Sequence, residues 1–286
     1  MVSLAAVAAF ASGCGVSRKH VVPPAQIRPA LDATKAQLLA QYNETARAIH
    51  SINAAMDLIP TAGSTYSGVI EQYHDVNGFI LAERPAHIRM IGQAPVVAKN
   101  VFDMVSDGET FRIFIPSKNK FITGPANLER PAKKPIENLR PQHLLDALFW
   151  PEIPAGALVL FEEWNEAPER YYILTELRNG PEGLEAARKI WIDRADLSFA
   201  HLEIFAAGGR LVTDIRYSDW EPVAAEPTPK YPRHIWVSRP HDDYQLEVKI
   251  TKLTVNEAIA ADRFELPQPP GTELVQVGEE TKEPTL

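Results

Sequence analysis

Large apolar side chains alternate with other residues along a series of short segments, and this pattern constrains the fold more than any other feature. Every second residue is large and apolar in five segments: 56–58, 79–81, 88–90, 102–104 and 111–113. Alternation at period two places such side chains on one face of a β-strand. Turn-forming sequences such as Ser106-Asp107-Gly108 separate the segments. The pattern therefore predicts successive antiparallel strands with a shared apolar face.

Two meanders of short strands are expected. The first runs from about residue 52 to residue 124, and the second runs from residue 157 to residue 253. In the first, Asn77-Gly78 carries the strongest two-residue turn signal, so we expect a hairpin turn there between two strands. The regular strand spacing predicts one large antiparallel sheet, curved into an unclosed β-barrel.

Two helices are expected beside this sheet. Asp32–His50 has apolar residues at three- and four-residue spacing, contains no Gly or Pro, and begins with Asp32 as a candidate N-cap. Pro141–Trp150 reads as a short second helix. Together these elements predict a mainly β fold with an α-helical lid, formed as one domain from residue 32 to residue 267.

The lone cysteine, Cys14, follows a short uncharged segment and the small residues Ala11-Ser12-Gly13. This arrangement looks like the cleavage box of a bacterial lipoprotein. It predicts a signal peptide at 1–13, a lipid attached to Cys14 and a proline-dotted tether at 14–31. By analogy with enteric bacteria, Gly15 favours the outer membrane. The simpler alternative is a free, buried cysteine. Residues 268–286, rich in Pro and Glu, are expected to form a flexible tail.

Composition excludes several classes of protein. The 29 basic and 37 acidic residues give a net charge of −8, which argues against nucleic-acid binding. One cysteine cannot form an internal disulfide or a paired-cysteine zinc site. The sequence contains no catalytic or nucleotide-binding signature, so we expect no enzyme, no cofactor and no metal. The cluster His241-Asp242-Asp243 is expected to be a solvated turn. A hydrolase that uses Glu162 or Asp193 is the less favoured alternative.

Ten residues form the predicted apolar wall, and methionine is prominent among them, as in adaptable binding surfaces. The ten are Met56, Leu58, Phe79, Leu81, Ile88, Met90, Phe102, Met104, Phe111 and Ile113. Two interpretations remain open. The wall is either the core beneath the helices or one side of a lidded cavity for a hydrophobic ligand.

The order of several motifs carries a resemblance to a known family. They are Val76–Leu81, Arg84–Arg89, Phe102–Gly108, Phe111–Pro116, Trp191–Asp193 and Phe264–Pro267. In this order the chain resembles the LolA/LolB-like lipoprotein-carrier superfamily, whose unclosed barrel, lidded by helices, holds acyl chains of lipoproteins that cross the periplasm. The resemblance implies an outer-membrane lipoprotein that faces the periplasm and binds acyl chains at the apolar wall. The alternative is a periplasmic sensor or scaffold that binds another envelope protein.

Overall fold

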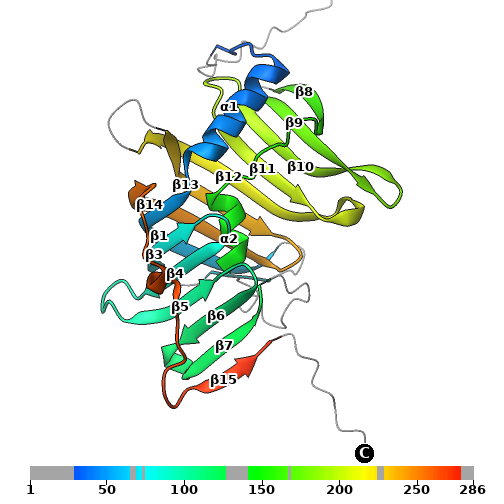
Figure 1. The fold of residues 1–286 in the computed structure, drawn as a ribbon. Coiled ribbons are helices and arrows are strands. Elements are labelled where there is room, and N and C mark those ends of the chain that lie inside the picture. Colours follow the sequence, from blue (N-terminus) through cyan, green and yellow to red (C-terminus); the bar gives the residue numbers. More distant parts are fainter. Residues whose placement is uncertain are drawn as a thin grey trace, which may run out of the picture.

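The computed structural model describes residues 29–64, 69–72, 75–126, 141–166, 169–223 and 229–277. Within these ranges the chain is mostly β-strand and has two α-helices (Figure 1). The predicted signal peptide, Cys14, most of the tether and the loop 127–140 lie outside the described residues. The division into signal peptide, tether, domain and tail stays a prediction.

The described strands form a single fifteen-stranded sheet, in the order β15-β7-β6-β5-β4-β3-β1-β14-β13-β12-β11-β10-β9-β8, with β2 paired to β1. The first meander comprises β1 (Ser51–Ser64), β2 (Val69–Gln72), β3 (Val76–Glu83), β4 (His87–Gln93), β5 (Asn100–Ser106), β6 (Thr110–Ile115) and β7 (Lys120–Pro125). The second comprises β8 (Leu158–Glu166), β9 (Glu169–Gly180), β10 (Gly183–Asp193), β11 (Phe199–Phe205), β12 (Leu211–Pro222), β13 (Lys230–Arg239) and β14 (Tyr244–Val255). The predicted large open sheet is therefore confirmed.

Strand β1 joins the two meanders, since it pairs with β3 on one side and with β14 on the other. The sheet curves strongly around the helices, so that one face is concave (Figure 1). Along the described part of the chain, no helix is both long and apolar enough to cross a membrane.

The expected turn at Asn77-Gly78 is wrong, because both residues lie inside β3. Gly78 is opposite Met56 of β1. A Cβ at Gly78 would lie 2.7 Å from Cδ1 of Leu58, so the glycine permits close packing and makes no turn here. The turn at Ser106-Asp107-Gly108 is confirmed between β5 and β6.

Helix α1 (Lys35–Ala48) is capped by Thr34, and the expectation that Asp32 is the N-cap is wrong. The Thr34 hydroxyl accepts a hydrogen bond from the Gln37 amide, and the Gln37 side chain accepts one from the Thr34 amide. This reciprocal capping box satisfies two helix N-terminal donors. Asp32 instead forms an ion pair with Arg194. Helix α2 (Pro141–Leu148) ends two residues earlier than expected.

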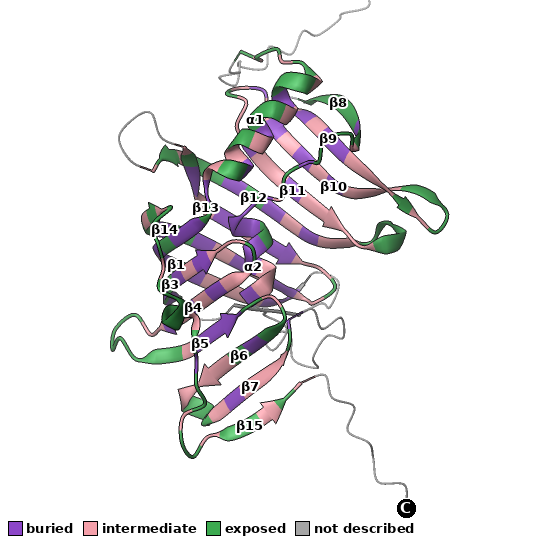
Figure 2. Ribbon diagram, in the orientation of Figure 1, coloured by how far each residue is buried: buried purple, intermediate pink, exposed green. Residues whose placement is uncertain are grey.

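The two helices cover different parts of the concave face. Helix α1 crosses the strands β9–β12, and α2 lies over the middle of the sheet (Figure 1). Figure 2 shows buried residues in the centre of the strands and exposed residues at the hairpin tips and along β8. The predicted helical lid is therefore present.

The described part of the C-terminal tail is folded, in contrast to the expected flexible segment at 268–286. Strand β15 (Glu273–Gln276) pairs in parallel with β7. Leu266 is buried with Val105 and Phe121 on the convex face, which attaches this segment to the first meander. Apolar burial and strand pairing therefore order a Pro-rich segment whose composition suggested flexibility. Residues 278–286 lie outside the described residues.

Candidate functional site

Eight of the ten residues of the predicted apolar wall share the inward face of the sheet. Phe79 and Leu81 lie on the opposite face, because residues 78 and 80 of β3 pair with the inward-facing Met56 and Ala54. The inward residues of β3 are Val76, Ile80 and Ala82. The error follows from the misassigned Asn-Gly turn, since a one-residue change of register exchanges the two faces of a strand.

The wall is mostly a filled core. Ile88, Met90 and Phe111 are fully buried, and Met56, Leu58 and Met104 are nearly so. Leu144, Leu145 and Leu148 of α2 belong to the same apolar cluster. Phe102 and Ile113 are half-buried at its margin. In this half of the sheet, α2 thus occupies the face that the sequence suggested as a cavity.

Polar contacts fix α2 in this position. The Ser106 hydroxyl donates to the Gln142 side chain at 3.0 Å, and the Tyr231 hydroxyl donates to the Leu148 carbonyl at 2.9 Å. Arg84 donates to the Trp150 carbonyl at 3.0 Å and to the Ala46 carbonyl of α1 at 2.9 Å. One guanidinium therefore connects the ends of both helices.

A groove of about 950 Å³ lies in the other half of the sheet, between α1 and the ends of β10–β13. Its apolar lining includes Leu38 and Tyr42 of α1 and Phe199 and Tyr217 of the sheet, which also belong to the main core cluster. Its polar lining consists of Gln41, Glu44, Thr45, Asp193, Asp196, Ser198, Ser218, Asp219 and Lys230. The volume falls in the range of small-molecule sites, about 300–1,000 Å³.

Aromatic rings support the floor of this groove. The Trp150 ring lies 5.6 Å from that of Phe199, 5.8 Å from that of Tyr217 and 5.4 Å from that of Trp220. Burial raises the pKa of the Tyr217 hydroxyl well above its ordinary value, so this phenol stays neutral. The floor is therefore uncharged and apolar, while the margin is acidic.

Sequence reasoning missed the groove because it took the wall from the first meander alone. Phe199, Tyr217 and Trp220 lie near strand ends in the second meander. Large aromatic residues close to predicted strand ends were the available signal, but sequence spacing cannot show that a groove remains between α1 and these strand ends.

Polar groups outside the groove lining hold α1 to the segment after α2. The Asn43 side chain donates to the Ile153 carbonyl and accepts from the Ile153 amide, both at 2.9 Å. The buried Arg188 of β10 pairs with Glu176 and donates to the carbonyls of Pro151 at 2.6 Å and Glu152 at 2.5 Å. These contacts control how far α1 and the 151–153 segment can separate.

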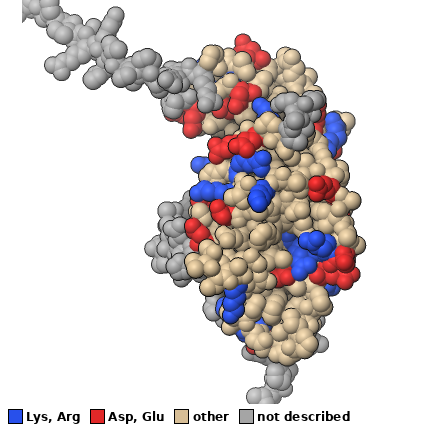
Figure 3. Space-filling view, turned by 90° about the vertical axis from the view of Figure 1, so that its left-hand side faces the viewer, with Lys and Arg blue, Asp and Glu red and all other residues tan. Residues whose placement is uncertain are grey.

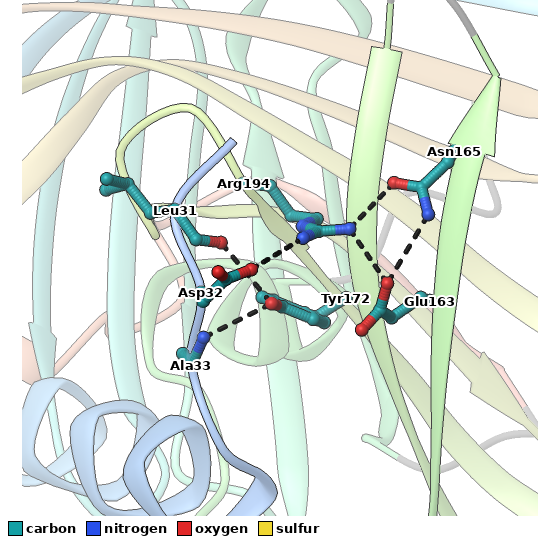
Figure 4. A network of polar contacts seen from close by, with 7 residues as sticks. All are labelled: Leu31, Asp32, Ala33, Glu163, Asn165, Tyr172 and Arg194. Carbon is teal, nitrogen blue, oxygen red and sulfur yellow. Dashed lines mark hydrogen bonds and ion pairs between the residues drawn. The ribbon is translucent and has the colours of Figure 1, made fainter. Parts of the chain in front are cut away.

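Arg194 anchors the segment before α1, as Figure 4 shows. Its guanidinium bonds Glu163 at 2.9 Å, Asn165 at 2.7 Å and Asp32 at 3.1 Å, and it lies over the Tyr172 ring. The Tyr172 hydroxyl accepts from the Ala33 amide at 3.2 Å. Strands β8–β10 therefore position the start of α1.

The two residues of the hydrolase alternative, Glu162 and Asp193, lie in different surroundings. Glu162 is exposed, and its neighbour Glu163 on the other face of β8 pairs with Arg194. Asp193 lines the groove and accepts a hydrogen bond from the Ala195 amide at 2.8 Å. The turn at His241-Asp242-Asp243 is confirmed, and Asp242 pairs with Arg239 at 2.5 Å. The hydrolase alternative remains an untested hypothesis.

A group of metal-ligand side chains lies on the convex face, and sequence reasoning missed it. His201 and Glu203 of β11 and Asp214 of β12 place one ligand atom each within 4.8 Å of one another. The available signal was a histidine and a glutamate two residues apart on a predicted strand. The cross-strand position of Asp214 could not be read from the sequence.

The face in Figure 3 carries Lys and Arg side chains interspersed with Asp and Glu. This mixture forms no extended basic field there, as the negative net charge led us to expect.

No family model matches the chain, and no curated protein matches its sequence. A DUF1329 family protein from Desulfovibrio piger is 13% identical, with a TM-score of 0.50 over 82% of this chain and 98% of the other. A LolA superfamily protein from Nitrosomonas europaea is 12% identical, with a TM-score of 0.48 over 82% and 99% of the two chains. An outer membrane lipoprotein-sorting protein domain from Vibrio parahaemolyticus, so described only provisionally, is 8% identical, with a TM-score of 0.45 over 79% and 94%.

A member of the superfamily that the sequence motifs resemble is therefore among the solved structures to which this chain is similar. The likeness is one of fold, an open antiparallel sheet with a helical lid.

Proposed function

We propose that this protein is a lipoprotein of the bacterial outer membrane that faces the periplasm and binds the acyl chains of lipidated proteins during their localisation. The observation that carries the proposal is the groove beside α1, whose apolar floor is continuous with the core of the sheet. The uncharged segment before Cys14 and the resemblance of the motifs to lipoprotein carriers support it.

The groove suits an acyl chain because its floor offers rings and aliphatic side chains and no charge. Burying a methylene group contributes about 0.8 kcal/mol, so a long chain gains substantial free energy without any polar contact. The acidic margin, with Glu44, Asp196 and Asp219, stays hydrated and leaves the floor to the apolar ligand. Binding and release require no covalent step.

Deeper entry of the chain requires α1 and the 151–153 segment to separate. The contacts that oppose this separation are the Asn43–Ile153 pair, the hydrogen bond from the Tyr42 hydroxyl to the Pro151 carbonyl at 2.9 Å, and the ion pair of Arg47 with Glu152 at 2.9 Å. A ligand favours the open arrangement only by its higher affinity for that arrangement. Burial of the acyl chain must therefore supply the free energy that breaking these contacts costs.

The test is lipid co-purification with the Cys14→Ser protein, which carries no lipid of its own. Native mass spectrometry and lipid extraction should detect bound acyl chains. Leu197→Asp introduces a charge into the groove lining and should lower the bound lipid by about tenfold or more.

The matched control is Leu184→Asp, the same substitution at an exposed leucine of the β9–β10 hairpin. This variant should bind as much lipid as the parent protein. A parent protein that is consistently empty and takes up no added lipid would contradict the proposal.

A second candidate function is a sensor or scaffold that binds another envelope protein. The exposed edge strand β8 favours it, because Leu158, Leu160 and Trp164 all remain solvent-accessible there. Exposed apolar edges are sites of strand pairing. Crosslinking in cells should then capture a stable protein partner, and Leu160→Lys should abolish its capture without affecting lipid binding.

A further inference from the structure

We propose that His201, Glu203 and Asp214 form a Zn²⁺-binding site on the convex face of the sheet, on the opposite face from the groove. His201 and Glu203 are two residues apart on β11 and therefore project from the same face, while the inward Leu202 between them is buried. Glu203 is directly opposite Asp214 of β12. Nε2 of His201 is 2.8 Å from Oδ1 of Asp214.

The spacing of these atoms fits a zinc ion. Zinc lies about 2.0–2.2 Å from imidazole nitrogen and carboxylate oxygen, so neighbouring tetrahedral ligands are about 3.3–3.6 Å apart. The three ligand atoms lie within 4.8 Å of one another, and small side-chain rotations bring them to this spacing. Three protein ligands leave the fourth position for water.

Charge at this place favours a cation. Two carboxylates directly opposite each other on neighbouring strands destabilise a sheet. Two cations flank the carboxylates. The guanidinium of Arg216 is 3.9 Å from Asp214, and its side chain is largely exposed and lies over the Trp236 ring. Lys189 of β10 is opposite Glu203, and its ammonium lies over the Phe205 ring at 5.8 Å. Zinc bound between Glu203 and Asp214 would neutralise both carboxylates.

A second histidine–carboxylate pair on the same face shows what distinguishes this site. Nε2 of His234 is 2.8 Å from Oε1 of Glu247, the same distance as in the His201–Asp214 pair. Its third member is Lys249, whose ammonium is 2.8 Å from Glu247. The hydrogen bond from Lys249 lowers the pKa of Glu247, so the ammonium of Lys249 already compensates the charge of this carboxylate. At the position of Lys249 the first pair has Arg216, whose guanidinium is 3.9 Å from Asp214, and it has Glu203 where the second pair has Trp236.

The surroundings restrict the movement of His201. The Trp191 ring packs on the imidazole at 5.4 Å between centroids, and Trp191 in turn packs against Trp164 at 5.3 Å and Tyr171 at 5.7 Å. An imidazole held in one orientation loses less rotational freedom when it binds a metal.

The test is zinc titration of the full Cys14→Ser chain at pH 7.5, followed by calorimetry. We expect one zinc ion per chain, weak or absent binding of Mg²⁺ and Ca²⁺, and the visible absorption of tetrahedral Co²⁺ when cobalt replaces zinc. Glu203→Gln and Asp214→Asn keep the shape of each side chain and should each weaken zinc affinity by about tenfold or more.

The matched control is His234→Gln, which should leave zinc affinity unchanged, while His201→Gln should abolish the binding. The unfolding temperatures of all four variants without zinc should match that of the parent and so exclude a loss of folding. Zinc binding that survives His201→Gln, or that falls equally with His234→Gln, would overturn the proposal. These outcomes do not depend on lipid binding.

Discussion

The two halves of the concave face use the same sheet in different ways. Under α2, the inward residues of β1 and β3–β6 are mostly aliphatic or methionine, with Phe102 and Phe111 among them, and helix leucines fill the space above them. Under α1, the rings of Phe199, Tyr217 and Trp220 form the floor of a groove. The difference shows that an apolar sheet face retains a groove only where its covering helix leaves space.

The half of the concave face under α2, here called the closed half, is stabilised mainly by packing. The half under α1, here called the open half, depends more on polar contacts between α1 and its neighbours. We expect substitutions in the closed half to reduce stability and to leave the amount of lipid bound per folded molecule unchanged. Substitutions in the open half should change lipid binding at a smaller cost in stability. Four measurements test this division.

The largest effect is expected at Arg188, which stands at the boundary of the two halves. Arg188→Ala should lower the free energy of unfolding by about 3–5 kcal/mol, because it leaves the Glu176 carboxylate inside the protein without its ion-pair partner. Urea unfolding at pH 7 measures the change. The double variant Arg188→Met with Glu176→Leu should recover most of the loss. An equally unstable double variant would show that the carbonyl contacts to Pro151 and Glu152 matter more.

Next in size is Met90→Ala in the closed half. Met90 is fully buried, and its truncation should cost about 2–5 kcal/mol through lost burial and a residual cavity. Lipid bound per folded molecule should stay unchanged. The matched groove substitution, Leu197→Ala, should cost about 1 kcal/mol or less and reduce bound lipid. The reverse pattern in denaturation and lipid measurements would break the division of the two halves.

A smaller effect is expected from Asn43→Ala in the open half. The loss of both Ile153 contacts should cost about 1–2 kcal/mol and speed lipid exchange, because α1 separates more readily from the 151–153 segment. Stopped-flow release of a fluorescent fatty acid measures the rate. Gln93→Ala, which removes one exposed side-chain contact to Asn100 outside the groove lining, is the control and should leave the rate nearly unchanged. Slower release from the Asn43 variant would contradict this role of α1.

The smallest effect concerns the β5–β6 hairpin of the closed half. Burial of Asp107 on its own raises the pKa of this carboxyl, but hydrogen bonds from the Thr110 and Glu109 amides outweigh it and hold the pKa below its usual value. The folded carboxylate thus stabilises the protein above the unfolded pKa of about 3.9. That contribution is lost as the pH falls through the lower folded pKa.

Asp107→Ala should therefore cost about 1 kcal/mol at pH 6, and its difference from the parent should shrink below about pH 4. Asp107→Asn keeps an acceptor oxygen without the charge and is the control. Urea unfolding at several pH values measures the difference. A gap that widens in acid would mean that the pKa shift has the opposite sign.

The sequence predicted the open sheet, the helical lid and most strand positions, since alternation and turn residues are local signals. It failed where long-range contacts decide. Gly78 looked like a turn residue, but close packing of the Leu58 side chain is the reason for a glycine at this position. The misassigned turn led to the wrong face for Phe79 and Leu81. Whether the wall is filled could not be predicted, because it depends on where Leu144 and its neighbours in α2 pack.

The groove and the convex-face histidine cluster depend on pairings between distant strands. The position of Asp214 beside Glu203 follows from the register of β11 and β12, which a bulge shifts near Phe205. A local pattern has no information about such a shift. The predicted acylation of Cys14 stays a prediction, because Cys14 lies outside the described residues.

The central position of β1 has a consequence for biogenesis. Ile52 pairs with Val255, so the first strand of the sheet meets a partner some 200 residues later in the chain. Closing so long a loop is entropically costly and slows folding. During synthesis from the N-terminus, the β1 edge and the adjoining apolar face therefore stay unpaired until β14 is available. A chaperone that shields this edge during synthesis should thus raise the yield of folded protein more than one that acts on the completed first meander.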